Sequence, residues 1–289
     1  MTDFASIYDD ERVAISFELF PPKTDEKCEE LYQTVRQLMQ FEPAYFTCTY
    51  GAGGSTQGRT LEILKRVKEI TSLPVASHLT CVGATRQELE EYLELAVAAG
   101  TNAIVALRGD PPKGTDTFVK PEGGFGYANE LVEMIREVQA PVGIAVAGYP
   151  EVHQEAVDGP TDLANLKRKV DAGADAVITQ LFYDNEDFYR FLDDCDGANI
   201  GVPIIPGILP VTNFAQAKRI ANMCKARIPD DLGEAMEAAD NREEEFEIGV
   251  EHARKQVLDL IDKKVPGIHL YVLNQCEAAI RMLDILQPR

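Results

Sequence analysis

The sequence lacks any apolar run near the roughly 20 residues that a membrane helix requires, and its mean hydropathy is -0.17. Its first residues, MTDFASIYDDER, lack the basic region and apolar stretch of a secretory signal. Positive charge is scarce: 28 Lys and Arg stand against 48 Asp and Glu, so the formal net charge is -20. Such a field repels nucleic acid and anionic membranes. We expect a soluble protein with neither as a partner, whose acidity serves solubility.

The sequence also lacks the spacings of several common sites. Its 6 cysteines are scattered, without a CxxC pair or a zinc-binding spacing. We therefore expect no metal site, and a reducing, cytoplasmic location. No GxGxxG, Walker loop or HExxH occurs. Any nucleotide is expected to bind without a Rossmann phosphate loop.

What the sequence does contain is a regular alternation of short apolar segments and helical patterns. Most of the segments are continuously apolar, which is typical of parallel strands buried on both faces. Glycines such as Gly100 and Gly173 end the helices between them. Strands are expected at 14–20, 44–50, 74–79, 102–107, 142–148, 175–181, 204–208 and 267–273. Eight βα units predict an α/β fold, a single (β/α)8 TIM barrel over residues 1–289.

Two connections are longer than the others. The first runs from Arg108 to Ala128 and is too long for a plain connector, so it is a candidate functional loop. The second leaves room for extra helices before the eighth strand and contains an acidic stretch at about 229–251. We interpret that stretch as a solvated helix–loop excursion, with a cation-binding segment as the alternative.

Polar side chains occur at nearly every predicted strand end. In a parallel barrel these ends meet at one mouth, where catalytic groups gather. The set comprises Glu18, Thr49, Tyr50, His78, Arg108, Gly109, Asp110, Tyr149, His153 and Gln180. Together these residues indicate a small-molecule enzyme that binds an anionic ligand.

Each of these signals also has a structural interpretation. Glu18 is either a structural hydrogen-bond acceptor or a desolvated acid with a raised pKa, and the cost of burying a carboxyl favours the acid. Taken alone, His78 fits a core histidine equally well, and Asp110 fits a turn residue better. The basic run 167–169 is either a solvated helix face or an anion site, for example for a pyrophosphate.

Seven segments match one known family in order. They are FELFPPKTDE, TYGAGGSTQGRT, HLTCVGATRQEL, IVALRGDPP, GYPEVHQEA, DLANLKRKVDAGADAVITQLFYD and IIPGILPVTNFAQAKRI. From about Ser16 to about Asp284 the chain resembles the bacterial single-domain type of 5,10-methylenetetrahydrofolate reductase. The resemblance implies an oligomeric barrel that binds flavin adenine dinucleotide (FAD). Such a barrel takes a hydride from NADH or NADPH and reduces methylenetetrahydrofolate to 5-methyltetrahydrofolate, which feeds methionine synthesis.

The resemblance also implies roles for individual residues. Glu18 would be the general acid that helps to open the five-membered ring of the folate, and Asp110 the carboxylate between flavin and pterin. Substrate contacts would come from Glu18, Asp110, Gln180, Gln216 and Gln275. The flavin would be held by Thr49, Tyr50, His78, Arg108, Gly109, Asp110, Tyr127, Ala128, Tyr149, His153, Asp162, Asn165, Arg168 and Lys169.

Two positions depart from the family's pattern. Gln275 stands where the family usually has an arginine, so the charge and the bidentate grip on a carboxylate are lost. Ile220 stands where some members present a phenylalanine for stacking. Two other functions stay open, namely a flavin-free, pterin-binding methyltransferase barrel and a catalytically silent barrel subunit of a larger complex.

Overall fold

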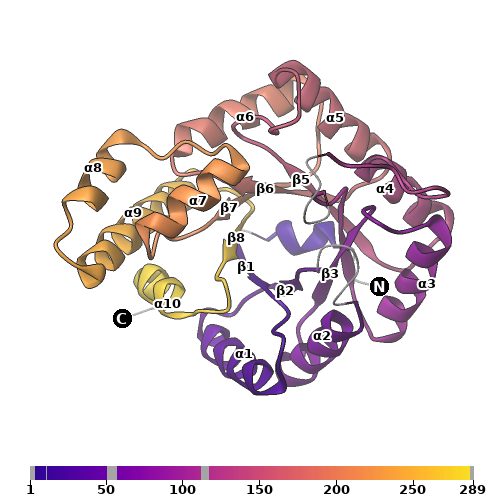
Figure 1. Cartoon of the computed structure of the whole chain (residues 1–289), viewed down its shortest axis with the longest axis horizontal. Coiled ribbons are helices and arrows are strands. Elements are labelled where there is room, and N and C mark those ends of the chain that lie inside the picture. The colour runs from indigo at the N-terminus through magenta and orange to yellow at the C-terminus, as the bar shows by residue number, and fades with distance from the viewer. Residues whose placement is uncertain (1–3, 11, 51–56, 112–116, 287–289) are drawn as a thin grey trace.

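The strands of the chain close into a barrel (Figure 1). The computed structural model describes residues 4–10, 12–50, 57–111 and 117–286. The parallel strands pair in chain order, and the first also pairs with the last. They are β1 (Ala14–Leu19), β2 (Tyr45–Cys48), β3 (Val75–Thr80), β4 (Ala103–Leu107), β5 (Gly143–Gly148), β6 (Ala176–Leu181), β7 (Ile204–Ile208) and β8 (Gly267–Tyr271). The predicted (β/α)8 barrel is confirmed.

Helices surround the barrel on its outside (Figure 1). They are α1 (Asp25–Leu38), α2 (Gln57–Thr71), α3 (Arg86–Ala98), α4 (Ala128–Glu137), α5 (Gly159–Asp171), α6 (Asn185–Gly197), α7 (Phe214–Cys224), α8 (Asp230–Ala238), α9 (Arg242–Asp262) and α10 (Glu277–Leu283), with the 3-10 turns η1 (Ala5–Tyr8), η2 (Met39–Phe41) and η4 (Asp284–Leu286). Local side chains fix where helices begin: Thr85 and Glu88 form a capping box at α3, and Asn241 caps α9. No helix among the described residues has the length and apolar character needed to cross a membrane.

Three helices, α7, α8 and α9, lie between β7 and β8 and project from one side of the barrel (Figure 1). The expected extra helices before the eighth strand are therefore confirmed. The acidic stretch 229–251 forms α8 and the first half of α9. Leu232 and Met236 of α8 are buried in a cluster with Phe214 of α7. The stretch is thus amphipathic: apolar side chains anchor it, and most of its acidic side chains stay exposed.

Alternate strand residues face two separate cores. Outward residues such as Phe17 and Phe46 pack beneath the helices. Inward residues of the lower barrel are mostly small, and they pack with Phe4, Tyr8 and Tyr45. Turn η1 lies at the centre of the ring of strands (Figure 1), and Phe4 meets the edge of Tyr45 at 5.2 Å. Because this segment fills the amino-terminal end, the mouth is at the carboxyl-terminal end of the strands.

Candidate active site

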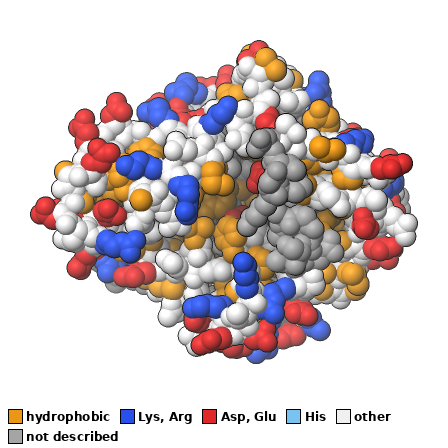
Figure 2. Space-filling model, in the orientation of Figure 1, with side chains coloured by type: hydrophobic (Ala, Val, Ile, Leu, Met, Phe, Trp, Pro, Cys, Tyr) orange, Lys and Arg blue, Asp and Glu red, His pale blue; other side chains and the backbone are white. Residues whose placement is uncertain are grey.

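The face that carries the mouth is hollowed at its centre (Figure 2). Hydrophobic and uncharged side chains border the hollow, and most Asp and Glu side chains lie toward the outer edge of this face. Residues 51–56 of the glycine-rich segment and Pro112 of the RGDPP segment lie outside the described residues. The described part of the site consists of the remaining strand ends and the loops that follow them.

Three ionisable side chains meet inside the barrel near this mouth. Glu18 of β1, His78 of β3 and His269 of β8 are 7%, 8% and 0% exposed. The Nε2 atom of His78 lies 3.3 Å from Oε2 of Glu18, and Nε2 of His269 lies 3.8 Å from the same oxygen. They come together because inward positions alternate along each strand and because β8 pairs with β1. We call these three residues the acid cluster.

The raised pKa expected for Glu18 is wrong for this arrangement. Burial raises the pKa of Glu18, but hydrogen bonds and positive charge from His269 and His78 lower the pKa to about 2. This low pKa favours the ionised form of the Glu18 carboxyl near neutral pH. The sequence did not reveal this, because both histidines are far from Glu18 along the chain.

Two aromatic rings and one hydrogen bond position the imidazole of His269. Its Nδ1 atom lies 2.8 Å from Oγ of Ser16. The ring of Tyr45 stacks on the imidazole at 6.2 Å and 15°, and the ring of Tyr271 meets it edge-on at 5.3 Å. The hydroxyl of Tyr271 donates to the carbonyl of Thr179 across the barrel at 2.7 Å. The imidazole thus has one orientation, with Nε2 toward Glu18.

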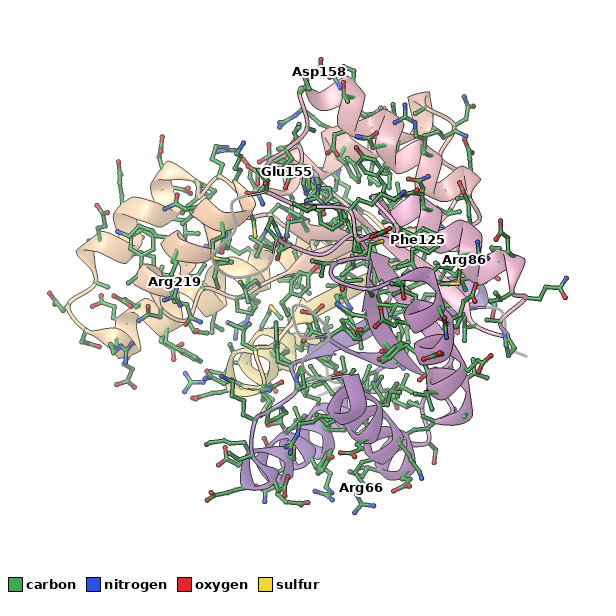
Figure 3. All side chains as sticks on the ribbon, turned by 45° about the vertical axis from the view of Figure 1, so that its right-hand side comes forward. Arg66, Arg86, Phe125, Glu155, Asp158 and Arg219 are labelled. Atoms are coloured by element: carbon green, nitrogen blue, oxygen red, sulfur yellow. The ribbon has the colours of Figure 1, made fainter. Side chains whose placement is uncertain are left out.

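On the opposite side of the mouth, Arg108 follows β4. Its guanidinium forms a two-point ion pair with Glu155, with Nη2 at 2.7 Å from Oε1. It also lies 4.9 Å from the centre of the Phe118 ring. Glu155 comes from the connection between β5 and α5 (Figure 3). The pair therefore joins two loops of the mouth.

Gly109 and Asp110 form the turn after Arg108. Gly109 has a φ of +88°, and a Cβ atom there would lie 2.8 Å from the side chain of Val82. Only glycine fits both the conformation and the space. Asp110 is exposed as a result. At the far end of the same long loop, Tyr127 is 66% exposed, whereas Ala128 is buried.

The exit of β5 carries an aromatic and cationic group. The rings of Tyr149 and His153 meet edge-on at 4.6 Å, and the backbone N–H of His153 donates to Asp162 at 2.9 Å. Lys169 of α5 donates to the carbonyl of Ala147, and its Nζ lies 5.8 Å from the centre of the Tyr149 ring. Burial lowers the pKa of Lys169 to about 8. The ammonium group of Lys169 is thus held beside the carboxyl end of β5, between Ala147 and Tyr149.

The basic run on α5 divides into three environments. Lys167 pairs with Asp171 one turn along the helix. Arg168 is exposed and donates to Oδ1 of Asn165 at 2.7 Å. Lys169 points inward. The run is therefore not a uniform solvated face, because Lys169 is turned toward β5 while Arg168 is exposed on the helix.

Thr49 and Tyr50 follow β2 and are fixed by neighbouring helices. The carbonyl of Thr49 accepts from Thr60 of α2 at 3.0 Å. Tyr50 is buried, and its ring meets Tyr92 of α3 edge-on at 5.1 Å. Both residues lie at the mouth, but the buried ring of Tyr50 has its partners within the protein.

The three expected substrate glutamines are placed separately. Gln180 sits where the β6–β7 register shifts, and its Oε1 accepts from the backbone N–H of Leu181 at 2.9 Å. Gln216 is half-buried in the first turn of α7. Gln275 is exposed in the turn after β8. Gln180 lies near the carboxyl end of β6, whereas Gln216 follows β7 and Gln275 follows β8, so all three lie around the same end of the barrel as the acid cluster.

Comparison with known proteins identifies the family. The model of the methylenetetrahydrofolate reductase family matches residues 3–287. The chain belongs to this family. It is 43% identical over 279 residues to 5,10-methylenetetrahydrofolate reductase of Salmonella typhimurium, which covers 96% of this chain and 92% of that protein. It is 39% identical over 289 residues to methylenetetrahydrofolate reductase (NADH) 1 of Arabidopsis thaliana, but spans only 49% of that protein.

A solved structure supports the fold. An uncharacterized protein from Clostridium thermocellum, described as binding two copies of 5-methyl-5,6,7,8-tetrahydrofolic acid, superposes with a TM-score of 0.66. It is 18% identical and covers 97% of each chain. The two proteins thus share the barrel architecture.

Three residues of the site were not predicted from the sequence. His269 and Tyr271 alternate in the segment GIHLY, which is the pattern of inward-facing positions in a strand. His269 lies in the middle of β8, away from the strand ends that signalled the mouth. Asn274 is a third: its side chain exchanges hydrogen bonds with the backbone N–H and carbonyl of Phe20, at 2.8 and 2.7 Å. This clamp ties the exit of β8, and hence Gln275, to the exit of β1.

Proposed function

We propose that the chain reduces 5,10-methylenetetrahydrofolate to 5-methyltetrahydrofolate with electrons from NADH or NADPH carried by bound FAD. The observation that supports this best is the acid cluster in the mouth of a barrel of this family. Two imidazoles, those of His78 and His269, approach one carboxylate oxygen of Glu18 between largely apolar strands. Such a cluster suits a reaction that needs one proton in a dry pocket.

The chemistry explains why a proton is needed. The carbon of methylenetetrahydrofolate accepts a hydride only after one ring nitrogen has been protonated and has left as an amine. Glu18 is the member of the cluster placed next to the strand end, so it would hand over this proton. Because its low pKa favours the ionised form, the carboxyl of Glu18 must gain a proton before it can act as the acid. Asp110, exposed on its glycine turn, would then face the cationic intermediate.

The residues around β4, β5 and α5 fit FAD. The exposed guanidinium of Arg168 and the ammonium of Lys169 suit a pyrophosphate, since charged donors bind phosphate oxygens well. Tyr127 is 66% exposed and offers an aromatic surface to a ring system. We assign the flavin contacts to these residues together with Thr49, His78, Arg108, Tyr149, His153, Asp162 and Asn165. When bound, FAD would store the hydride between the two half-reactions.

The electron donor is proposed to be NADH or NADPH, and three plant relatives are named as NADH enzymes. We also propose a cytoplasmic homo-oligomer. The chain spans about half the length of those plant relatives, 48–49%, and about nine-tenths of the bacterial ones, 92% for two of them.

Anaerobic spectroscopy tests the proposal. Purified protein loaded with FAD is expected to be yellow, to bleach with NADH or NADPH, and to regain its colour when methylenetetrahydrofolate is added. Bleaching without recovery would argue for a different acceptor. Protein that binds methylenetetrahydrofolate but neither retains FAD nor oxidises a nucleotide would favour the flavin-free methyltransferase instead.

A further inference from the structure

The connection between β5 and α5 contains a residue in a strained backbone conformation. Val152 has a φ of +72°. In this left-handed region the branched side chain of a valine crowds its own backbone, so the conformation persists only where surrounding contacts hold it. Val152 lies between Tyr149 and His153, which the family resemblance assigns to the flavin, and next to Glu151, to which the resemblance gives no role. The contacts of Glu151 therefore help to shape this side of the mouth.

Two contacts to this connection come from the short segment that follows α7. We call residues 225–227 the α7 tail. The Oε1 atom of Glu151 accepts from the backbone N–H of Arg227 at 2.8 Å. The ammonium group of Lys225 donates to the backbone carbonyl of Gln154 at 2.7 Å. The α7 tail is thus joined at two points to a loop that lies 71 and 76 residues earlier in the chain.

A third contact ties the α7 tail to the neighbouring connection between β6 and α6. The Nη2 atom of Arg227 lies 2.8 Å from Oδ2 of Asp184 and 3.0 Å from Oδ2 of Asp187. The side chain of Asp187 is only 3% exposed, and Arg190 also pairs with it. A buried carboxylate needs such partners, because removing one leaves a charge uncompensated. The α7 tail is therefore bonded to the loops that follow two adjacent strands.

The α7 tail is continuous with α7, so its position fixes the direction of the helix. Lys225 ends α7 with a φ of +55°, and the N–H groups of Lys225 and Ala226 both donate to the carbonyl of Ala221. The 11 residues of α7 span about 16 Å. Gln216 lies at the opposite end, in the first turn, where its N–H donates to the side chain of Asn213 at 2.8 Å. A shift of the tail would therefore tilt α7 and move Gln216.

We propose that Glu151 is a positioning residue for folate binding, because by holding the α7 tail it sets the place of Gln216 at the mouth. The inference rests on the function proposed above and on the folate contact that the family resemblance gives to Gln216. Glu151 acts through Arg227 and α7 rather than by touching the folate. Its Oε1 is already bonded to Arg227, and its Oε2 is buried, without a hydrogen-bond partner among the described residues. The loop that carries flavin contacts thus also orients the helix that carries a folate contact.

The kinetic test compares Glu151→Leu with Glu151→Gln. Leucine has no acceptor for the N–H of Arg227, whereas glutamine keeps an oxygen in the same place. With FAD at saturation, Glu151→Leu is expected to raise the folate KM about tenfold, as the loss of one hydrogen bond allows. The kcat of folate reduction and the rate of flavin reduction by nucleotide are expected to stay within about twofold, because Glu151 touches no reacting group. Glu151→Gln is expected to restore the KM to within about twofold of the wild type.

Glu237→Leu is the matched control. Glu237 belongs to α8 and pairs with Lys218 in the middle of α7 at 3.4 Å. The substitution therefore makes the same chemical change and removes a contact to the same helix, but it leaves the bonds of the α7 tail in place. Its folate KM is expected to match the wild type within about twofold.

A second measurement does not depend on turnover. Amide hydrogen exchange of the FAD-loaded protein, followed by mass spectrometry of peptides from residues 214–227, reports how firmly α7 is held. We expect exchange in the last turn of α7 and at Arg227 to rise about tenfold in Glu151→Leu and to stay at the wild-type level in Glu151→Gln and Glu237→Leu. FAD content and thermal stability of each variant check its folding.

The outcomes separate the inference from the proposed function. If the wild type reduces folate and Glu151→Leu binds FAD more weakly but has the wild-type folate KM, Glu151 supports only the flavin loop and the inference is wrong. Equal defects in Glu151→Leu and Glu151→Gln overturn it as well, because glutamine keeps the bond to the α7 tail. If Glu151→Leu does not fold, Lys225→Met, which removes the second bond, is expected to raise the folate KM about threefold, and an unchanged KM overturns the inference. If the wild type binds FAD but reduces no folate, the proposed function fails and the inference fails with it.

Discussion

Charged groups on the two sides of the barrel mouth differ in their access to solvent. On the side of β1, β3 and β8, the side chains of Glu18 and His78 are 9% and 10% exposed. On the side of β4 and β5, those of Arg108 and Glu155 are 20% and 43% exposed. The buried charges respond chiefly to one another, so their protonation is set by the fold. The paired charges of Arg108 and Glu155 are in contact with solvent. Under the proposed function, the buried side would serve proton transfer and the more exposed side ligand binding.

The largest effect, on the rate of folate reduction, is expected from a substitution of Glu18 on the buried side of the mouth. Glu18→Gln keeps the shape of the side chain but cannot pass on a proton, so folate reduction should fall by about 100-fold or more. Flavin reduction by nucleotide should persist. Single-turnover kinetics of each half-reaction measure the two rates. Equal slowing of both would show that Glu18 supports the whole mouth rather than the proton step.

The next largest effect, on FAD affinity, is expected from a substitution of Arg168 on α5. Arg168→Ala should weaken FAD binding about tenfold to a hundredfold, the range for a lost charge-assisted hydrogen bond, without changing stability. Lys167→Ala is the matched control, because that ammonium already pairs with Asp171. Fluorescence titration of apoprotein with FAD gives the Kd. Equal Kd values for all three proteins would mean that the basic run contributes nothing to the flavin.

The protonation of Lys169 is expected to make FAD binding depend on pH. Its pKa is lowered to about 8, so the ammonium is charged below that pH and becomes neutral as the pH rises through it. FAD binding should therefore weaken above about pH 8, since a neutral amine attracts phosphate less. Lys169→Met should bind FAD more weakly and lose this pH dependence. The same titration between pH 6 and pH 10 checks the sign, and a flat wild-type curve would contradict it.

Gly109→Ala tests whether the turn, rather than any charge, presents Asp110. The φ of +88° and the contact with Val82 predict a loss of about 1–3 kcal/mol in the free energy of unfolding. Gly197→Ala, at a helical glycine with open space around its Cα, should instead stabilise by up to about 1 kcal/mol. Urea denaturation measures both. Similar stability of the two variants would show that the turn adapts.

The smallest effect is expected at Gln275. An arginine there restores a charge in an exposed turn, so Gln275→Arg should lower the folate KM by about tenfold or less, and added salt should reduce the gain. Gln275→Glu should raise the KM. Steady-state kinetics at two salt concentrations test both variants. Identical KM values would place folate recognition on other residues.

The sequence predicted the barrel well because each buried parallel strand is a short apolar run with a clear end. It predicted the residues of the mouth for the same reason, since strand ends converge in this fold. It gave the wrong direction for the pKa of Glu18, because that value depends on His78 and His269, which only barrel closure brings near. The splitting of the basic run into paired, exposed and inward side chains was likewise invisible, because it depends on how α5 is rotated against β5.

The pairing of β1 with β8 has a consequence for how the protein is made. Of the barrel strands, the one that carries Glu18 is synthesised first and the one that carries His269 last. Until β8 is synthesised, the barrel has two open edges, and Glu18 lacks one of its two histidine partners. The Asn274 clamp to Phe20 also forms only then. A chain that lacks β8 therefore has an incomplete acid cluster, even though Glu18 and His78 are both present.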